Sequence, residues 1–254
     1  MAEFQTSVAR GGVRADIDAG LKAYMSGVYM LMSIAMIVTG AFAYGIGQDL
    51  LALRQGQETL LPRELLLTAY AGWGKWIIML APLALVFFLS FRIHAMSYQA
   101  AQGTFWLYAA LVGVSIASIF AVFTGVSIAQ TFLVTAIAFL SLSLYGYTTK
   151  RDLSGMGTFL IMGLIGLIVA MVVNIFLESS ALSFAISVIG VLIFAGLTAY
   201  DTQRIKSEYI MMANAGPEGQ AFMQKGALMG ALSLYLNFLN MFLFLLQFMG
   251  ATEE

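Results

Sequence analysis

Asp201 is the residue of this sequence whose type and position most suggest a chemical role. It follows a stretch from Ser179 to Tyr200 without any charged residue, and Arg204 and Lys206 come shortly after it. A carboxylate at a helix end can simply lie in headgroup water and pair with such a cation. An ionisable residue within a membrane segment is instead usually functional and faces the interior of the helix bundle. Position alone leaves both interpretations open.

Few other side chains offer catalytic or metal-binding chemistry. The absence of cysteine excludes disulfides, thiolate metal sites and thiol catalysis, and the single histidine, His94, excludes multi-histidine zinc or haem sites. Three motifs typical of other classes are absent from the sequence. These are GxGD of intramembrane aspartyl proteases, GxSG of rhomboid-type serine proteases and GxxxxGK[ST] of P-loop proteins. We therefore expect no enzyme activity, no catalytic residue and no cofactor beyond a bound calcium ion.

The composition is that of a protein embedded in lipid. Of the 254 residues, 61% are hydrophobic and 10% are charged, against about 25% charged in soluble domains. The net charge of −1 gives no sign of a nucleic-acid partner. Lipid offers no hydrogen-bond partners, and the apolar runs do not alternate with polar residues, so they should span as helices. We predict an all-α integral membrane protein with seven transmembrane helices, at about residues 25–46, 72–92, 105–125, 128–147, 155–177, 180–201 and 226–250.

Lysines and arginines predict the orientation of these helices, because cytoplasmic loops carry an excess of both. One side of the membrane receives nine of them: Arg10, Arg14, Lys22, Arg92, Lys150, Arg151, Arg204, Lys206 and Lys225. The other side receives three: Arg54, Arg63 and Lys75. We therefore expect residues 1–24 to form a cytoplasmic tail, residues 25–252 to form the transmembrane domain, and the C-terminus to be periplasmic. Asp49, Glu58 and Glu64 of the outer loop are expected to be surface charges.

The segment GLTAYDTQRIK, which contains Asp201, resembles the signature of the Bax inhibitor-1 family, the TMBIM group with bacterial YccA-like and YetJ-like members. The similarity extends over most of the chain after residue 105. It includes SLYGYTTKRDLSGMGTFLIMGLIGLI (143–168), NIFLESSALSFAISVIGVLIFAGLTAYDTQRIK (174–206) and ALSLYLNFLNMFLFLLQFMG (231–250). The resemblance implies a bacterial inner-membrane protein of seven helices in which the sixth is central.

The resemblance also implies an activity, because some family members are similar to pH-sensitive calcium leaks. In those members two aspartates share a site near the cytoplasmic mouth, and an arginine at the end of the second helix engages them. Asp201 matches the first aspartate and Arg92 matches the arginine. The second aspartate lies in a pattern like SLYLDFIN, which reads SLYLNFLN here and places Asn237 at that position.

Asn237 changes the chemistry that the resemblance implies. Two neighbouring carboxylates repel when both are ionised, which makes such a pair sensitive to pH. An amide removes that repulsion and lowers the charge on which calcium affinity depends. We therefore predict weaker pH switching and a weak calcium site. Asp201 and Asn237 are the candidate ion-binding and pH-sensing residues, Asp201 is the candidate calcium ligand, and Arg92 is the candidate gating counter-charge.

The most concrete function that follows is a slow leak of calcium or another cation, gated near the cytoplasmic mouth. Its partners would be the lipid bilayer and the cation. The alternative is a regulator that transports nothing and acts on a membrane-bound AAA protease or in a stress response, as some bacterial relatives are expected to do. A regulator would depend on the N-terminal tail more than on Asp201.

Overall fold

A computed structural model describes the backbone of residues 2–215 and 217–252, and the side chains of residues 18–215, 219 and 222–252. Arg10 and Arg14, which were counted on the cytoplasmic side, lie outside the described side chains. The chain is 88% helical, and the described ranges contain no β-strand. The prediction of an all-α fold is confirmed.

Seven helices are long and apolar enough to cross a membrane, which confirms the predicted number within the described residues. They are α1 (Ala2–Arg54), α3 (Gly74–Arg92), α4 (Tyr98–Ile116), α6 (Gly125–Thr148), α7 (Ser154–Leu177), α8 (Ser180–Asn214) and α9 (Pro217–Met249). Shorter elements connect them: α2 (Arg63–Leu66), a π-helical turn at Leu67–Ala71, a 3-10 turn at Ile93–Ala95 and α5 (Ile119–Val122).

Helix α8 continues well beyond the expected end of the sixth span at residue 201. It ends at Asn214, about 20 Å further along the helix axis. The added turns keep their helical form because they continue to pack within the bundle, where Ile205 and Tyr209 are buried. Asp201 therefore lies inside a helix and not at its end.

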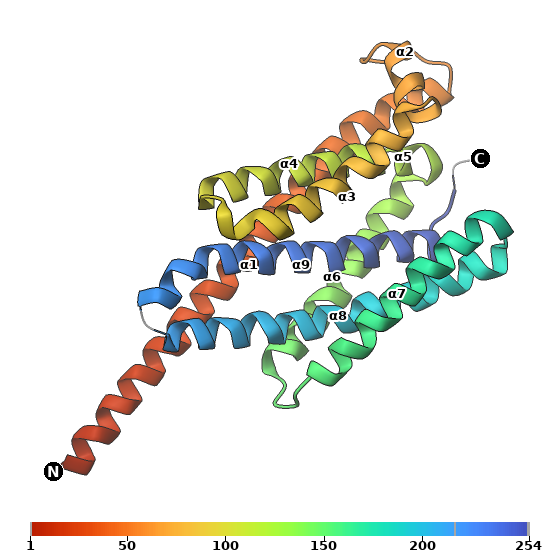
Figure 1. Cartoon of the computed structure of the whole chain (residues 1–254). Helices are drawn as coiled ribbons and strands as arrows, with labels where there is room; N and C mark the ends of the chain where they lie inside the picture. Colours follow the sequence, from red (N-terminus) through yellow and green to blue (C-terminus); the bar gives the residue numbers. More distant parts are fainter. Residues whose placement is uncertain (1, 216, 253–254) are drawn as a thin grey trace.

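Helices α8 and α9 form the centre of the bundle (Figure 1). Besides packing on each other, α8 packs against α1, α6 and α7, and α9 packs against α1, α4 and α6. The apolar 18-residue stretch of α9 has 67% of its residues buried, compared with 39% for α8 and 6% for α7. The sixth helix thus shares the central position with the seventh.

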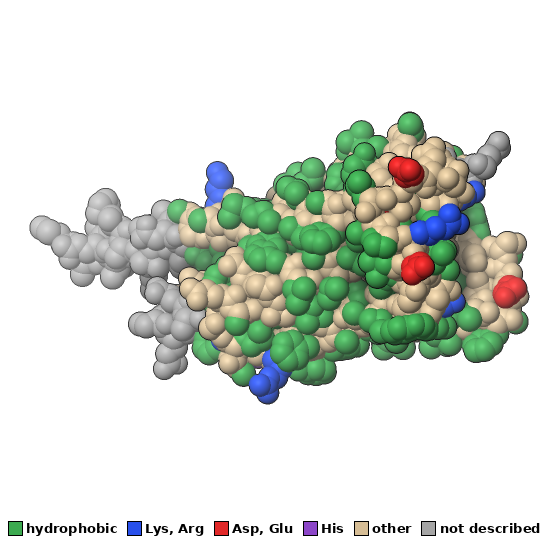
Figure 2. Space-filling model, turned by 90° about the horizontal axis from the view of Figure 1, so that it is seen from above, with side chains coloured by type: hydrophobic (Ala, Val, Ile, Leu, Met, Phe, Trp, Pro, Cys, Tyr) green, Lys and Arg blue, Asp and Glu red, His purple; other side chains and the backbone are tan. Residues whose placement is uncertain are grey.

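The outer surface suits a bilayer. Hydrophobic side chains on α7 point outward, with Phe159 70% and Met162 64% exposed. On the face seen in Figure 2, charged side chains lie toward the two ends, and the stretch between them shows none. Monomeric soluble proteins rarely expose apolar patches of this extent, so a membrane accounts for the surface.

The two ends of the bundle carry the two groups of cations on which the orientation was predicted. At one end, Lys206 Nζ donates to the Tyr147 carbonyl at 2.7 Å, and Lys225 Nζ donates to the His94 carbonyl at 3.1 Å. At the opposite end, Arg54 donates to the Ala121 carbonyl at 2.5 Å. The chain termini lie at opposite ends of the bundle (Figure 1).

Asp49 corrects one sequence-based expectation. It is 5% exposed and is therefore not a surface charge. Its two carboxylate oxygens accept hydrogen bonds from the backbone N–H groups of Leu60 and Leu61, at 2.8 and 3.0 Å. These bonds satisfy the buried carboxylate and tie the segment that follows α1 back onto that helix. Nearby, burial raises the pKa of Tyr70 to about 12, so its hydroxyl remains a donor to the Val114 carbonyl at 2.7 Å.

Candidate functional site

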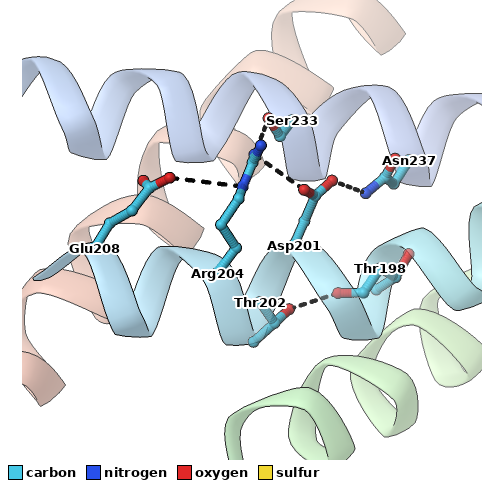
Figure 3. A network of polar contacts seen from close by, with 7 residues as sticks. All are labelled: Thr198, Asp201, Thr202, Arg204, Glu208, Ser233 and Asn237. Carbon is cyan, nitrogen blue, oxygen red and sulfur yellow. Dashed lines mark hydrogen bonds and ion pairs between the residues drawn. The ribbon is translucent and has the colours of Figure 1, made fainter. Parts of the chain in front are cut away.

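Asp201 and Asn237 meet between the two central helices. Asp201 lies on α8 and is 7% exposed, and Asn237 lies on α9 and is 4% exposed. Asn237 Nδ2 donates to Asp201 Oδ2 at 2.7 Å (Figure 3). The structure thus brings together the two residues that the sequence singled out as an ion-binding pair.

Arg204 supplies the positive charge beside Asp201. Its Nη2 lies 2.9 Å from Asp201 Oδ1, one turn along the same helix. The same nitrogen donates to Ser233 Oγ of α9 at 3.0 Å, and Arg204 Nε lies 3.7 Å from Glu208 Oε1 (Figure 3). Arg204 is therefore shared among two carboxylates and a hydroxyl. Its side chain is 39% exposed, whereas that of Asp201 is 11% exposed, so the ion pair extends from the bundle interior toward water.

Arg92, the candidate counter-charge, does not make this ion pair in the structure. It is the last residue of α3 and is exposed. Among the described residues, no hydrogen bond or ion pair of its side chain is found. The end of α3 approaches the network from the Glu208 side, where His94, Glu208 and Lys225 line a cavity of about 250 Å³. A role for Arg92 in another conformation stays a prediction.

A second set of hydroxyl groups lies beside Asp201 on the face of α8 that packs against α6. Thr202 Oγ1 donates to the Thr198 carbonyl at 2.8 Å and is hydrogen-bonded to Ser143 Oγ of α6 at 2.9 Å. Ser143 is in turn hydrogen-bonded to the hydroxyl of Tyr29 on α1. These bonds connect three helices at the depth of Asp201 and fix the rotation of α8 about its axis.

The contact between α8 and α9 alternates between polar and aromatic pairs. Ser187 Oγ donates to Gln247 Oε1 at 3.0 Å near one end. Seven residues further along α8, Phe194 stacks on Phe244 with ring centroids 6.0 Å apart. Another seven residues along α8 is Asp201. Because a spacing of seven residues returns to nearly the same helix face, the phenylalanine pair separates two polar clusters along one line.

The chemistry open to the site is reversible cation binding. Asp201 offers two carboxylate oxygens, and Asn237 offers an amide oxygen if its side chain rotates. Calcium takes six to eight oxygen ligands, and within the described residues no group of three or more acidic, histidine or cysteine side chains could hold a metal ion. A cation at Asp201 would need water or backbone oxygens to complete its shell.

Some members of the network were not expected from the sequence. The sequence suggests Arg204 as a partner of Asp201 only if the carboxylate lies in headgroup water and has no function. Glu208 lies one turn beyond Arg204, and the i, i+4 spacing is a signal that could have found it. Ser233 and Ser143 carry no such signal, because their roles depend on how α6 and α9 pack against α8.

Comparison with known sequences identifies the family. The family model described as "Inhibitor of apoptosis-promoting Bax1" matches residues 21–254. The chain belongs to the Bax inhibitor-1 family. The resemblance recognised in the Asp201 motif is thereby confirmed, and the match reaches back through the first helices, where the motifs were less clear.

Bacterial relatives that match this Bax inhibitor-1 family member over most or all of their length support the assignment. An uncharacterized protein of Caulobacter vibrioides is 44% identical over 263 residues and covers 100% of both chains. An uncharacterized protein of Rickettsia prowazekii is 42% identical over 256 residues, again covering 100% of both. The inner membrane protein YbhL of Escherichia coli is 42% identical over 232 residues, which are 91% of this chain and 93% of YbhL.

Proposed function

We propose that this Bax inhibitor-1 family member is a slow cation leak of the bacterial inner membrane, with calcium as the leading substrate. The observation that carries the proposal is the buried carboxylate of Asp201, which lies between the two central helices and bonds Asn237 on the second of them. Ionisable residues within spanning helices are rare and mark ion pathways. The proposal assigns the protein no catalytic role.

The structure corresponds to the resting state in this proposal. Both carboxylate oxygens of Asp201 are occupied, one by Arg204 and the other by Asn237. The guanidinium of Arg204 therefore holds the place that a cation would take. Glu208, 3.7 Å from Arg204 Nε, offers the arginine a second carboxylate. Rotation of Arg204 toward Glu208 would free Asp201 for a cation without exposing an unpaired charge.

The charges at the site fit a leak better than a storage site. Asp201 and the amide of Asn237 carry one formal negative charge between them, and Arg204 cancels it at rest. Because calcium affinity rises with the number of charged ligands, such a site would bind weakly and release quickly. An amide does not titrate, so the pair should respond to pH less steeply than a pair of aspartates.

The orientation belongs to the same proposal. The end of the bundle that carries Lys206 and Lys225 would face the cytoplasm, together with the N-terminus, and the C-terminus would be periplasmic. The placement in the inner membrane is supported by the name of the relative YbhL, an inner membrane protein. Asp201 would then be reached from the cytoplasmic side, past Arg204.

The test is calcium entry into liposomes that contain the purified protein and an entrapped calcium indicator. We expect the wild type to admit calcium faster than empty liposomes and Asp201→Asn to change that rate several-fold. The matched control is Asp152→Asn, because Asp152 is a fully exposed carboxylate in the connection between α6 and α7. Wild-type liposomes as tight as empty ones would refute the proposal.

The second candidate, a regulator of a membrane-bound AAA protease, is favoured by one feature of the backbone. Helix α1 begins at Ala2 and extends beyond the ends of the neighbouring helices (Figure 1), so it could reach a partner at the membrane surface. Deletion of residues 1–17 separates the two functions. A leak that survives the deletion favours transport, and a protease effect that depends on these residues, together with tight liposomes, favours regulation.

A further inference from the structure

Three adjoining cavities lie between α1 and α6, away from Asp201. Both helices pack on the central pair of α8 and α9, and the space between them is incompletely filled. The inner, middle and outer cavities have volumes of about 510, 450 and 340 Å³. Tyr29 and Leu140 line both the inner and the middle cavity, and Met36, Gly40 and Phe132 line both the middle and the outer one. The cavities therefore form one continuous groove.

The groove is apolar and open toward the lipid. Its rims include Ile37 at 70%, Leu140 at 64% and Leu144 at 63% exposure. Tyr29 and Ser143, which line the inner cavity, belong to a chain of hydrogen bonds that continues to Thr202 of α8. Because these bonds hold α1, α6 and α8 together, the groove exists before any occupant arrives.

The inner end of the groove is positively charged. Lys22 lines the inner cavity together with Ser26 and Tyr147. Lys206 reaches the same place, since its Nζ donates to the Tyr147 carbonyl at 2.7 Å and lies 5.1 Å from the centre of the Tyr147 ring. No carboxylate whose side chain is described lines this cavity. Within the described residues, Asp18, one turn before Lys22 on α1, forms no ion pair with it.

We propose that this groove binds an anionic phospholipid from the leaflet at the Lys22 end of the bundle. The phosphate-containing headgroup would lie beside Lys22 and Lys206, and one acyl chain would lie in the inner and middle cavities. From Ser26, which lines the inner cavity just below Lys22, to Met36, which lines the middle cavity, is about 15 Å along the helix. This is half of the hydrocarbon core of about 30 Å, and therefore the depth of one leaflet. An acyl chain that starts at the headgroup level can therefore end in the middle cavity beside Met36. This inference does not depend on ion transport.

The charge at the inner end favours a lipid with net negative charge over a zwitterionic one. An anionic headgroup gains roughly a fivefold preference from each lysine near the membrane surface. If the attraction were diffuse, removing any surface lysine at this end would lower the preference for the anionic lipid. If a site binds the lipid, removing Lys22 in particular lowers that preference.

Native mass spectrometry of the purified protein, with dioleoyl phosphatidylglycerol or dioleoyl phosphatidylethanolamine added, tests the site. We expect the wild type to retain one phosphatidylglycerol and to prefer it at least about fivefold over phosphatidylethanolamine. Lys22→Gln should reduce that preference about fivefold. The matched control is Lys150→Gln, because Lys150 is exposed at the same end and does not line the groove, and it should leave the preference unchanged.

A second pair of variants tests the apolar part of the groove. At Gly40 and at Gly45, an added Cβ would have no heavy atom within 4 Å, so both positions accept a larger side chain. Side chains on a helix lean toward its N-terminus, and Gly40→Phe would therefore fill the middle cavity near Met36. Gly45→Phe, on the same helix but outside the groove, is the control. We expect Gly40→Phe to lose both lipids and Gly45→Phe to keep them.

Two results would overturn the proposal. Equal effects of Lys22→Gln and Lys150→Gln would mean a diffuse attraction and no site. Equal lipid retention by Gly40→Phe and Gly45→Phe would mean that the acyl chain lies elsewhere. Circular dichroism and gel filtration of each variant establish that it is folded, and glycine replacement within a helix should not lower its stability.

Discussion

Replacing Arg204 with glutamine should open the proposed leak. The variant removes the charge that occupies Asp201 Oδ1 at 2.9 Å. A hydrogen bond to a charged group contributes about 1.5–3 kcal/mol, and because the Arg204 side chain is 39% exposed, solvent screening reduces this to about 1–2 kcal/mol. If the bond holds the resting state closed, that loss shifts the equilibrium about 5–30-fold toward the open state. We therefore predict a rise in the calcium leak of that size.

The assay is the initial rate of calcium entry into liposomes at matched protein density. Lys150→Gln is the control, because it removes an exposed cation at the same end of the bundle, in the connection between α6 and α7, and not beside Asp201. Arg92→Gln tests the other candidate counter-charge and should raise the rate less than Arg204→Gln. An unchanged rate in Arg204→Gln, or a larger rise in Arg92→Gln, would refute the assignment of Arg204 as the group that closes the site.

Three further outcomes follow from the structure. Asn237→Asp should make the leak depend more steeply on pH, because two facing carboxylates repel once both are ionised, and a flux–pH profile as shallow as that of the wild type would contradict this. Phe194→Ala should raise the leak by removing the ring that separates two polar clusters, whereas Phe184→Ala, at a 57% exposed position, should not. Asp49→Ala should destabilise the protein by about 1–3 kcal/mol, since the backbone N–H groups of Leu60 and Leu61 lose a charged acceptor, and hydrogen exchange at Leu60 and Leu61 should speed up.

The number and type of helices could be predicted from the sequence because lipid imposes a strict rule. Every backbone polar group in the hydrocarbon region needs an internal partner, so an uncharged run of about 20 residues can form little else than a helix. The same rule says nothing about where a helix stops in water. Helix α8 illustrates this, since buried Ile205 and Tyr209 extend it past the last apolar run to Asn214.

The pairing of Asp201 with Asn237 could be predicted because both residues lie in family motifs. The counter-charge could not be predicted in the same way. Arg204 is three residues from Asp201, a spacing that suits an ordinary ion pair on a helix surface. Its proposed role in closing the site depends also on its contacts with Ser233 and Glu208. That depends on the packing of α9 on α8, which sequence spacing does not determine. Asp49 shows the same limit, because its burial results from a loop that folds back onto α1.

The measurement that tests the central claim most directly is the infrared difference spectrum of the purified protein on addition of calcium. The claim is that a cation takes the place of Arg204 at the carboxylate of Asp201. We predict a shift of a carboxylate band in the wild type that is absent in Asp201→Asn and that appears at a lower calcium concentration in Arg204→Gln. Identical difference spectra for the wild type and Asp201→Asn would contradict the claim.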